Sequence, residues 1–188
     1  NPLQVARAQL DEAERTGSPE AFEKTREAQN RMETIIEDVL TLARQGESVD
    51  ETAPLSLSTL VERCWGHVDT SGASLSLDAD MTFRADSGRC GQLFENLFRN
   101  AIEHAGENVT VTVGALSDGF YVEDDGPGIP DDERAQVFEY GYTTTQEGTG
   151  FGLNIVEEIA DAHGWSVTVT DSDGGGARFE FTGVVSET

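Results

Sequence analysis

Basic residues are scarce in this sequence. Its 188 residues contain 12 lysines and arginines against 36 aspartates and glutamates, and Lys24 is the only lysine. The formal net charge is −24 at pH 7. An acidic excess of this size opposes electrostatic attraction to nucleic acid or to an anionic membrane surface. We therefore expect neither nucleic-acid binding nor membrane contact from this chain.

Long apolar runs and clustered cysteines are also missing. No stretch approaches the roughly 20 apolar residues of a membrane-spanning helix, and the first residues lack the basic and apolar segments of a signal peptide. The two cysteines, Cys64 and Cys90, have no metal-ligand spacing. We expect them to be free, buried thiols rather than a disulfide.

The acidic residues are spread over the whole chain and do not form a tail. A solvated acidic surface is the expected result. This balance resembles that of proteins from salt-accumulating halophiles, where high ionic strength screens the self-repulsion of the folded chain. The hydrophobic content of 37% still suffices for one domain of ordinary size and a smaller appendage.

Residues 1–46 have the pattern of a helical hairpin. Gly17 suits the end of a first helix, and Ser18 followed by Pro19 suits the start of a second. Two helices with one apolar stripe each cannot close a core, so we expect a second copy to complete a four-helix bundle in a homodimer. The alternative is that the stripes pack on the rest of the same chain. The stripe residues are Leu3, Ala6, Leu10 and Ala13, then Met32, Ile35, Ile36, Val39, Leu42 and Ala43.

A polar linker over residues 47–54 separates this hairpin from a second domain over residues 55–188. Helices and mainly antiparallel strands follow one another there, which implies an α+β fold with a mixed sheet and helices on one face. The sequence predicts a short strand at Leu55–Leu57, helices at 59–68, 91–104 and 152–163, strands at 74–77, 81–84, 109–113 and 119–123, and a final hairpin at 165–183.

A polar pair interrupts the helix predicted for "QLFENLFRNAIEH". Asn96 and Asn100 are one turn apart and share a face, while Leu93, Leu97 and Phe98 point toward the core. Carboxamide oxygens are hard, neutral ligands that suit Mg²⁺ when it also keeps water and phosphate oxygens. Solvated asparagines are the alternative interpretation.

The segment "DDGPGIP" follows a predicted strand and places acid beside glycine. A buried carboxylate accepts hydrogen bonds from an amine and repels phosphate, so we expect Asp124 to bind the exocyclic amine of a purine. Gly126 and Gly128 would let the backbone turn tightly beside the ring. A plain turn is the alternative, because Asp, Gly and Pro all favour turns.

A glycine-rich loop runs into the last predicted helix. Gly148, Gly150 and Gly152 precede its apolar repeat, and Phe138 and Tyr142 lie just before them in "VFEYGYTT". Free N–H groups and the positive end of the helix dipole at such a start attract an anion. The loop does not follow an early strand in a strand-helix-strand unit and no lysine follows the glycines, which excludes a Rossmann fingerprint and a Walker loop.

In this order and spacing, the segments resemble the N, G1, F and G2 boxes of sensor histidine kinases, within the GHKL (Bergerat-type) ATPase superfamily. The resemblance covers residues 59–182, and the hairpin before it resembles the dimerisation and phosphotransfer domain of these kinases. It implies a cytoplasmic protein that binds ATP with Mg²⁺ on Asn100. It also implies that residues 140–147 form a lid anchored by Phe138. The implied nucleotide-binding residues are Asn96, Asn100, Asp124, Gly126, Gly128, Ile129, Phe138, Tyr142, Gly148, Thr149, Gly150, Phe151, Gly152 and Leu153.

The chain departs from related patterns in two places. Hydrolytic members of the superfamily have a glutamate base where this helix has Asn96, and the adjacent Glu95 would point about 100° away around the helix. Slow attack by water should then favour transfer over hydrolysis. Many kinases have Lys or Arg at the position of Glu103, so phosphate neutralisation would depend more on Mg²⁺.

The first residues, "NPL", resemble the end of the kinase H box, whose phosphorylated histidine would lie four residues before Asn1. The resemblance implies autophosphorylation of that histidine and transfer of the phosphoryl group to an aspartate of a response regulator. Asn1 matches the family position that orients water for dephosphorylation, although an N-cap role is the alternative. An ATP-binding dimeric scaffold and a true GHKL ATPase are the competing functions.

Overall fold

The computed structural model divides the chain into two compact units, Asn1–Gln45 and Gly46–Thr188. It describes residues 2–42, 49, 51–70, 72–106, 108–143 and 149–187. Asn1, Gly148 and residues 144–147 of the proposed lid therefore lie outside the described residues.

The first unit is a hairpin of helices α1 (Pro2–Thr16) and α2 (Pro19–Leu42). Gly17 ends α1 with a φ of 67°, a left-handed conformation that glycine adopts without strain. The side chain of Ser18 accepts a hydrogen bond from the N–H of Ala21 at 3.4 Å and caps α2. The predicted helix boundary at Gly17 and Ser18 is thus confirmed.

Small side chains fill the buried face of the hairpin, while the larger apolar ones are exposed. The buried residues are Ala6, Ala13, Ala21, Thr25, Ala28 and Asp38. Leu3, Val5, Leu10, Phe22, Ile36, Val39 and Leu40 are exposed. The predicted stripes therefore split: Ala6 and Ala13 are buried within the hairpin, whereas Leu3, Leu10, Ile36 and Val39 are exposed.

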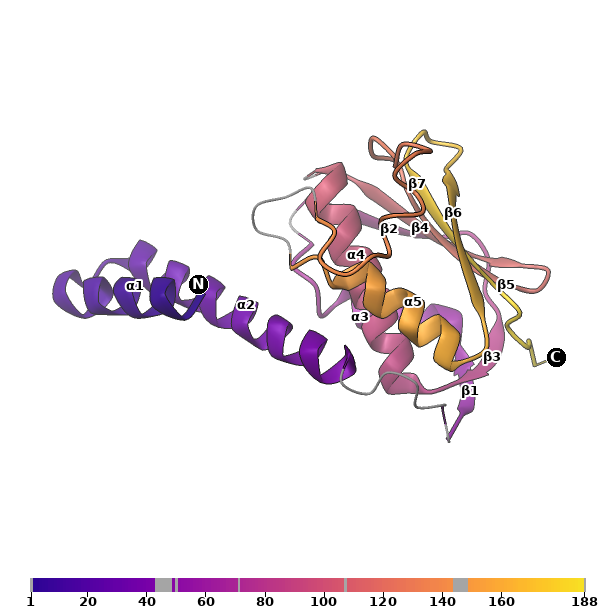
Figure 1. Ribbon diagram of the computed structural model, residues 1–188, viewed down its shortest axis with the longest axis horizontal. Coiled ribbons are helices and arrows are strands. Elements are labelled where there is room, and N and C mark those ends of the chain that lie inside the picture. The colour runs from indigo at the N-terminus through magenta and orange to yellow at the C-terminus, as the bar shows by residue number, and fades with distance from the viewer. Residues whose placement is uncertain are drawn as a thin grey trace. The chain divides into compact units, whose positions relative to one another are not determined.

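The second unit is an α+β sandwich, as predicted. Its main sheet has the order β2-β4-β5-β7-β6, with β2 parallel to β4 and the other neighbours antiparallel. Helices α3, α4 and α5 lie on one side of this sheet (Figure 1). The elements are β2 (Ser74–Leu77), β4 (Thr110–Leu116), β5 (Gly119–Asp124), β6 (Ser166–Asp171), β7 (Ala177–Thr182), α3 (Leu57–Trp65), α4 (Ser87–Ala105) and α5 (Gly152–Ala162).

A short accessory ladder was not foreseen from the sequence. Strand β1 (Ala53–Ser56) pairs antiparallel with β3 (Thr82–Ala85) in a sheet of their own. The prediction that Leu57 belongs to a strand is wrong, because Leu57 is the first residue of α3 and is fully buried. The side chain of Ser56 accepts a hydrogen bond from the N–H of Thr59, so it caps the helix, which begins two residues earlier than expected.

Aromatic side chains dominate the core between sheet and helices. The ring of Phe120 on β5 lies 4.7 Å from Phe181, 5.3 Å from Phe94 and 5.6 Å from Phe83, measured between centroids. The indole of Trp165 meets the same ring edge-on at 5.8 Å. This cluster joins α4 to the middle of the sheet, so it fixes the helix that carries the asparagine pair.

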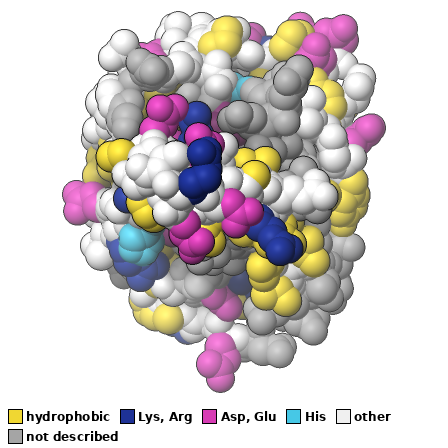
Figure 2. Space-filling view, turned by 90° about the vertical axis from the view of Figure 1, so that its left-hand side faces the viewer, with side chains coloured by type: hydrophobic (Ala, Val, Ile, Leu, Met, Phe, Trp, Pro, Cys, Tyr) yellow, Lys and Arg dark blue, Asp and Glu magenta, His cyan; other side chains and the backbone are white. Residues whose placement is uncertain are grey.

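The state of the cysteines and the distribution of surface charge can be compared with the expectations from the sequence. Cys64 and Cys90 are free and buried, as predicted, and burial raises the pKa of the Cys64 thiol to about 11. Acidic side chains are interspersed with apolar and basic ones on the face shown in Figure 2. In the described part of the chain, no helix combines the length and hydrophobicity needed to cross a membrane.

The central ring gives a test of this core. Replacing Phe120 with Ala should lower the free energy of unfolding by about 3–5 kcal/mol, because a buried ring is lost and a cavity remains. Urea denaturation at fixed salt measures the change. As a control, Val185→Ala at a side chain that is 74% exposed should change the value by less than about 0.5 kcal/mol. Equal effects of the two substitutions would contradict the assigned core.

Candidate nucleotide-binding site

Helix α4 presents two asparagines with unsatisfied amides. Asp86 caps the start of this helix by accepting from the N–H groups of Gly88 and Arg89. One face of α4 enters the core, and Asn96 is buried with it at 3% exposure. The Nδ2 atoms of Asn96 and Asn100 are both buried and have no hydrogen-bond partner among the residues that the structure describes. Because buried polar groups normally have partners, these two amides indicate a place for a polar ligand.

The start of α5 lies against this pair. Gly152 is the first residue of α5, and a Cβ placed there would be 3.6 Å from the Oδ1 atoms of both Asn96 and Asn100. Phe151 occupies the N-cap position and provides no side-chain hydrogen bond. The first N–H groups of α5 therefore have no side-chain cap, and the positive end of the helix dipole lies beside the two amides.

A third asparagine, which the sequence analysis missed, belongs to the same cluster. Asn154 in the first turn of α5 is 5% exposed, and its Nδ2 donates to the carbonyl of Phe138 at 3.1 Å. Its Oδ1 is buried, and no described residue forms a hydrogen bond with it. The polar residue within the apolar repeat "GLNIVEEIA" was the available signal. Phe138 is thereby tied to α5.

Asp124 ends strand β5 at a different point of the same domain. Its Oδ1 accepts hydrogen bonds from the N–H groups of Gly126 at 2.9 Å and Ala177 at 3.2 Å. Among the described residues, no hydrogen bond reaches its Oδ2. Burial raises the pKa of this carboxyl above its usual range, and the two N–H bonds oppose that rise. The carboxyl group is therefore rigidly held with one oxygen available.

The loop after Asp124 passes directly over the end of α4. A Cβ on Gly126 would lie 2.3 Å from the Cβ of Ala105, the last residue of that helix, so only glycine fits there. Gly128 has a φ of 73° and turns the chain toward the hairpin of β6 and β7. The loop that follows Asp124 therefore contacts α4, the same helix that carries Asn96 and Asn100.

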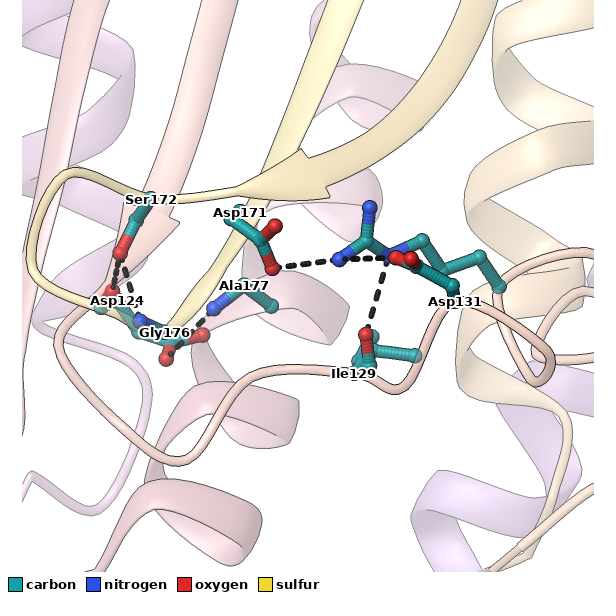
Figure 3. A network of polar contacts seen from close by, with 8 residues as sticks. Asp124, Ile129, Asp131, Asp171, Ser172, Gly176 and Ala177 are labelled. Atoms are coloured by element: carbon teal, nitrogen blue, oxygen red, sulfur yellow. Dashed lines mark hydrogen bonds and ion pairs between the residues drawn. The ribbon is translucent and has the colours of Figure 1, made fainter.

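Arg134 fastens the far end of this loop, and the sequence analysis did not identify it. Its Nε donates to the carbonyl of Ile129 at 3.0 Å, and its guanidinium pairs with Asp131 and with Asp171 at the end of β6 (Figure 3). The loop between Asp124 and Asp131 is therefore held at both ends against the β6–β7 hairpin.

Four further predicted residues that the structure describes, Tyr142, Thr149, Gly150 and Phe151, have local contacts. Tyr142 donates to Glu133 at 2.5 Å, and the hydroxyl of Thr149 accepts from the N–H of Phe151 at 3.3 Å. The N–H of Gly141 donates to the carbonyl of Gly150 at 3.1 Å, which brings together the two ends of the segment between them. Leu153 and Phe151 are half-buried at the start of α5. Gly148 lies outside the described residues.

Two of the histidines, His67 and His163, have structural contacts. His67 contacts Glu95 at 3.0 Å, so this glutamate pairs with the end of α3. His163 caps α5 through Nδ1 to the carbonyl of Ile159 and accepts the N–H of Asp86 at Nε2. Neither Glu95 nor these imidazoles is free to serve as a base at Asn96.

Together these features form a site with two chemically different ends. Asp124 offers a fixed acceptor at one end. At the other, an uncapped helix start and neutral amides offer donors to an anion and oxygens to a hard cation. A purine nucleotide with a divalent cation has this sequence of groups. The Nδ2 donors of Asn96 and Asn100, which have no partner among the described residues, fit its phosphate oxygens.

The family comparison agrees with this geometry. Residues 85–184, which contain α4, Asp124 and α5, match the family described as histidine kinase-, DNA gyrase B-, and HSP90-like ATPase. The chain belongs to this ATPase family. The match also bears out the resemblance to sensor histidine kinases, because similar proteins carry that description.

Two of these relatives are sensor proteins. The chain is 33% identical to the sensor protein FixL of Bradyrhizobium diazoefficiens over 178 residues, which cover 86% of this chain and 34% of FixL. It is 27% identical to the sensor protein QseC of Escherichia coli K12 over 186 residues, 93% of this chain and 41% of QseC. The chain therefore spans less than half the length of either relative.

A solved structure extends the comparison to both units. Full-length ShkA, crystallised with AMPPNP, matches with a TM-score of 0.69 and 24% sequence identity, over 100% of this chain and 47% of ShkA. At this identity the similarity establishes the fold alone. The chain thus shares its α+β architecture and N-terminal helical region with ShkA.

The buried carboxyl gives a prediction about stability. A raised pKa in the folded state means that the stability contributed by Asp124 is present below its ordinary value of 3.8 and is lost as the pH rises through the folded value. The D124N variant does not ionise, so its advantage in free energy of unfolding over the unaltered protein should grow from about pH 4 toward neutrality. Urea denaturation at constant KCl measures this difference.

The D118N variant is the matched control for that experiment. Asp118 lies in the exposed turn between β4 and β5, so its substitution removes one negative charge without changing the buried group. A D124N advantage that shrinks with rising pH, or one equal to that of D118N at every pH, would contradict the account of Asp124.

Proposed function

We propose that this domain binds ATP together with Mg²⁺. The observation that carries the proposal is that the start of α5, which has no side-chain cap, lies beside the amides of Asn96 and Asn100, which have no partner among the described residues. The ATPase family of the chain agrees with it. The Oδ2 of Asp124 would accept the exocyclic amine of adenine, and Gly126, Gly128 and Ile129 would line the base. The binding of AMPPNP by the similar ShkA supports this assignment.

The phosphate groups would lie at the other end of the site. The oxygen of Asn100 would ligate Mg²⁺, with Asn96 supporting the phosphates, since amide oxygens suit this ion. The N–H groups of Gly150, Gly152 and Leu153 would face the phosphate oxygens, with Gly148 and Thr149 before them. The bound ion would supply charge neutralisation that Glu103 cannot provide. Phe138 and Tyr142 would border the nucleotide beside α5.

We further propose that the chain is the catalytic core of a protein-histidine kinase. The phosphoryl group would pass to a histidine that precedes Asn1 and then to an aspartate of a response regulator, as the family resemblance implies. The contact of Glu95 with His67 supports transfer over hydrolysis, because Glu95, the carboxylate next to Asn96 in the sequence, is then engaged by His67 and does not activate water. Asn1 is proposed to orient water during regulator dephosphorylation.

The hairpin would serve as the dimerisation unit. Several of its large apolar side chains are exposed while Ala6, Ala13, Ala21 and Ala28 are buried, which fits a second copy packing on the exposed side chains in a four-helix bundle. The net charge of −24 suits a protein that works at high ionic strength, where self-repulsion is screened. A cytoplasmic location would provide the ATP that the reaction needs.

Calorimetry with AMPPNP and Mg²⁺ at high KCl tests the nucleotide site. The D124N variant should bind about ten- to a hundredfold more weakly, because a hydrogen bond to a charged acceptor is replaced by one to an amide that also presents a donor. The D118N variant should bind like the unaltered protein. If all three proteins show the same affinity, the proposed adenine contact is wrong.

The kinase reaction is tested on a longer chain that includes the residues preceding Asn1. With ATP labelled in the γ position, this chain should gain phosphate that is stable to alkali and labile to acid, as expected of phosphohistidine. The same chain carrying D124N should gain much less. Nucleotide binding without labelling would favour the scaffold, whereas rapid ADP release without an acceptor would favour a hydrolytic ATPase.

A further inference from the structure

The turn between β6 and β7 is packed against Asp124 more closely than a surface turn requires. A Cβ on Gly176 would lie 2.2 Å from the carbonyl oxygen of Asp124 and 2.4 Å from its Oδ1. The N–H of the next residue, Ala177, binds that same Oδ1. This turn therefore forms one wall of the space around the carboxyl group (Figure 3).

Ser172 is the buried hydroxyl that joins this wall to Asp124. Its Oγ donates to the carbonyl of Asp124 at 2.7 Å and accepts from the N–H of Gly176 at 2.8 Å. The side chain is 7% exposed, so water does not readily replace either bond. The backbone of Ser172 also closes the turn by donating to the carbonyl of Gly176 at 2.9 Å.

We infer that Ser172 is a positioning residue that sets the orientation of the Asp124 carboxylate, and with it the preference for adenine over guanine. This inference rests on the proposed nucleotide function. The hydrogen bonds of the Ser172 hydroxyl go to the Asp124 carbonyl and the Gly176 N–H, so it acts through the backbone of Asp124 and through the Gly176–Ala177 segment.

The link to base preference follows from hydrogen-bond polarity. An ionised carboxylate only accepts hydrogen bonds, so a fixed Oδ2 accepts the 6-amino group of adenine and opposes the 6-oxo group of guanine. Without the Ser172 hydroxyl, the Asp124 carbonyl and the Gly176 N–H lose a buried partner and the turn must shift to find others. Ala177 shifts with the turn, so the Oδ1 of Asp124 loses the N–H of Ala177 as a fixed donor. The Asp124 carboxylate can then rotate, and the discrimination between adenine and guanine falls.

The S172A variant tests this inference by calorimetry with AMPPNP and GMPPNP, each with Mg²⁺ at high KCl. Affinity for AMPPNP should fall about three- to tenfold, and the ratio of the AMPPNP to GMPPNP affinities should fall with it. Ser172→Thr keeps the hydroxyl and should restore most of both. Ser166→Ala removes an exposed hydroxyl from β6 of the same hairpin and should change neither.

The double variant S172A/D124N separates positioning from general stability. If Ser172 acts through Asp124, adding S172A to D124N should cause no further loss of AMPPNP affinity. A full additional loss, or S172A affinity and base preference equal to those of the unaltered protein, would overturn the inference. If D124N binds AMPPNP weakly but S172A binds it like the unaltered protein, the inference about Ser172 is wrong and the proposed function stands. If D124N also binds AMPPNP like the unaltered protein, both are wrong.

Folding of each variant is checked by thermal unfolding before titration. If S172A does not fold, Ser172→Cys takes its place, because a thiol has similar volume and forms weaker hydrogen bonds. Its affinity for AMPPNP and its base preference should shift in the same direction as expected for S172A. Unchanged values for Ser172→Cys would overturn the inference.

Discussion

The burial of the Asp124 carboxyl group is the constraint around which the second unit is arranged. A buried carboxylate is unfavourable unless hydrogen bonds satisfy it, and here backbone N–H groups from two sides supply them. One comes from Gly126 in the loop after β5, and the other from Ala177 at the start of β7. Both segments must therefore stay in place, which requires the β5–β7 pairing and the anchors Ser172 and Arg134 behind them.

Helices α4 and α5 extend this arrangement to the opposite end of the site. His163, just after α5, accepts the N–H of Asp86 at the start of α4, while Gly152 at the start of α5 meets Asn96 and Asn100. The two helices are thus antiparallel and fixed at two points. Ten residues separate Asp86 from Asn96, and α5 spans 11 residues, so both distances are about 15 Å at 1.5 Å per residue. This match keeps the amides of α4 beside the N–H groups of α5.

The sequence predicted those parts of the site that depend on local spacing, and it missed those that depend on tertiary contacts. Asn96 and Asn100 share a face because they are one turn apart, and Asp124 follows an alternating strand; both patterns are visible in a short window. The roles of Asn154 and Ser172 arise from partners 16 and 48 residues away, which no periodicity encodes. The strand predicted at Leu57 failed for a related reason, since the cap provided by Ser56 outweighed the alternation of two leucines.

A strongly acidic protein that binds a polyanion must attract it by short-range contacts. With one lysine in the chain and Glu103 near the asparagine pair, long-range attraction is weak, so the proposed phosphate contacts are backbone N–H groups, amides and a divalent cation. An ion pair between a lysine and a phosphate at an exposed site weakens as the salt concentration rises, because the Debye length falls to about 3 Å at 1 M. Hydrogen bonds from an uncapped helix start act within contact distance and are screened much less. Neutral donors therefore let a protein with a negatively charged surface bind the negatively charged ligand that we propose. High ionic strength helps, because it screens the repulsion between the two.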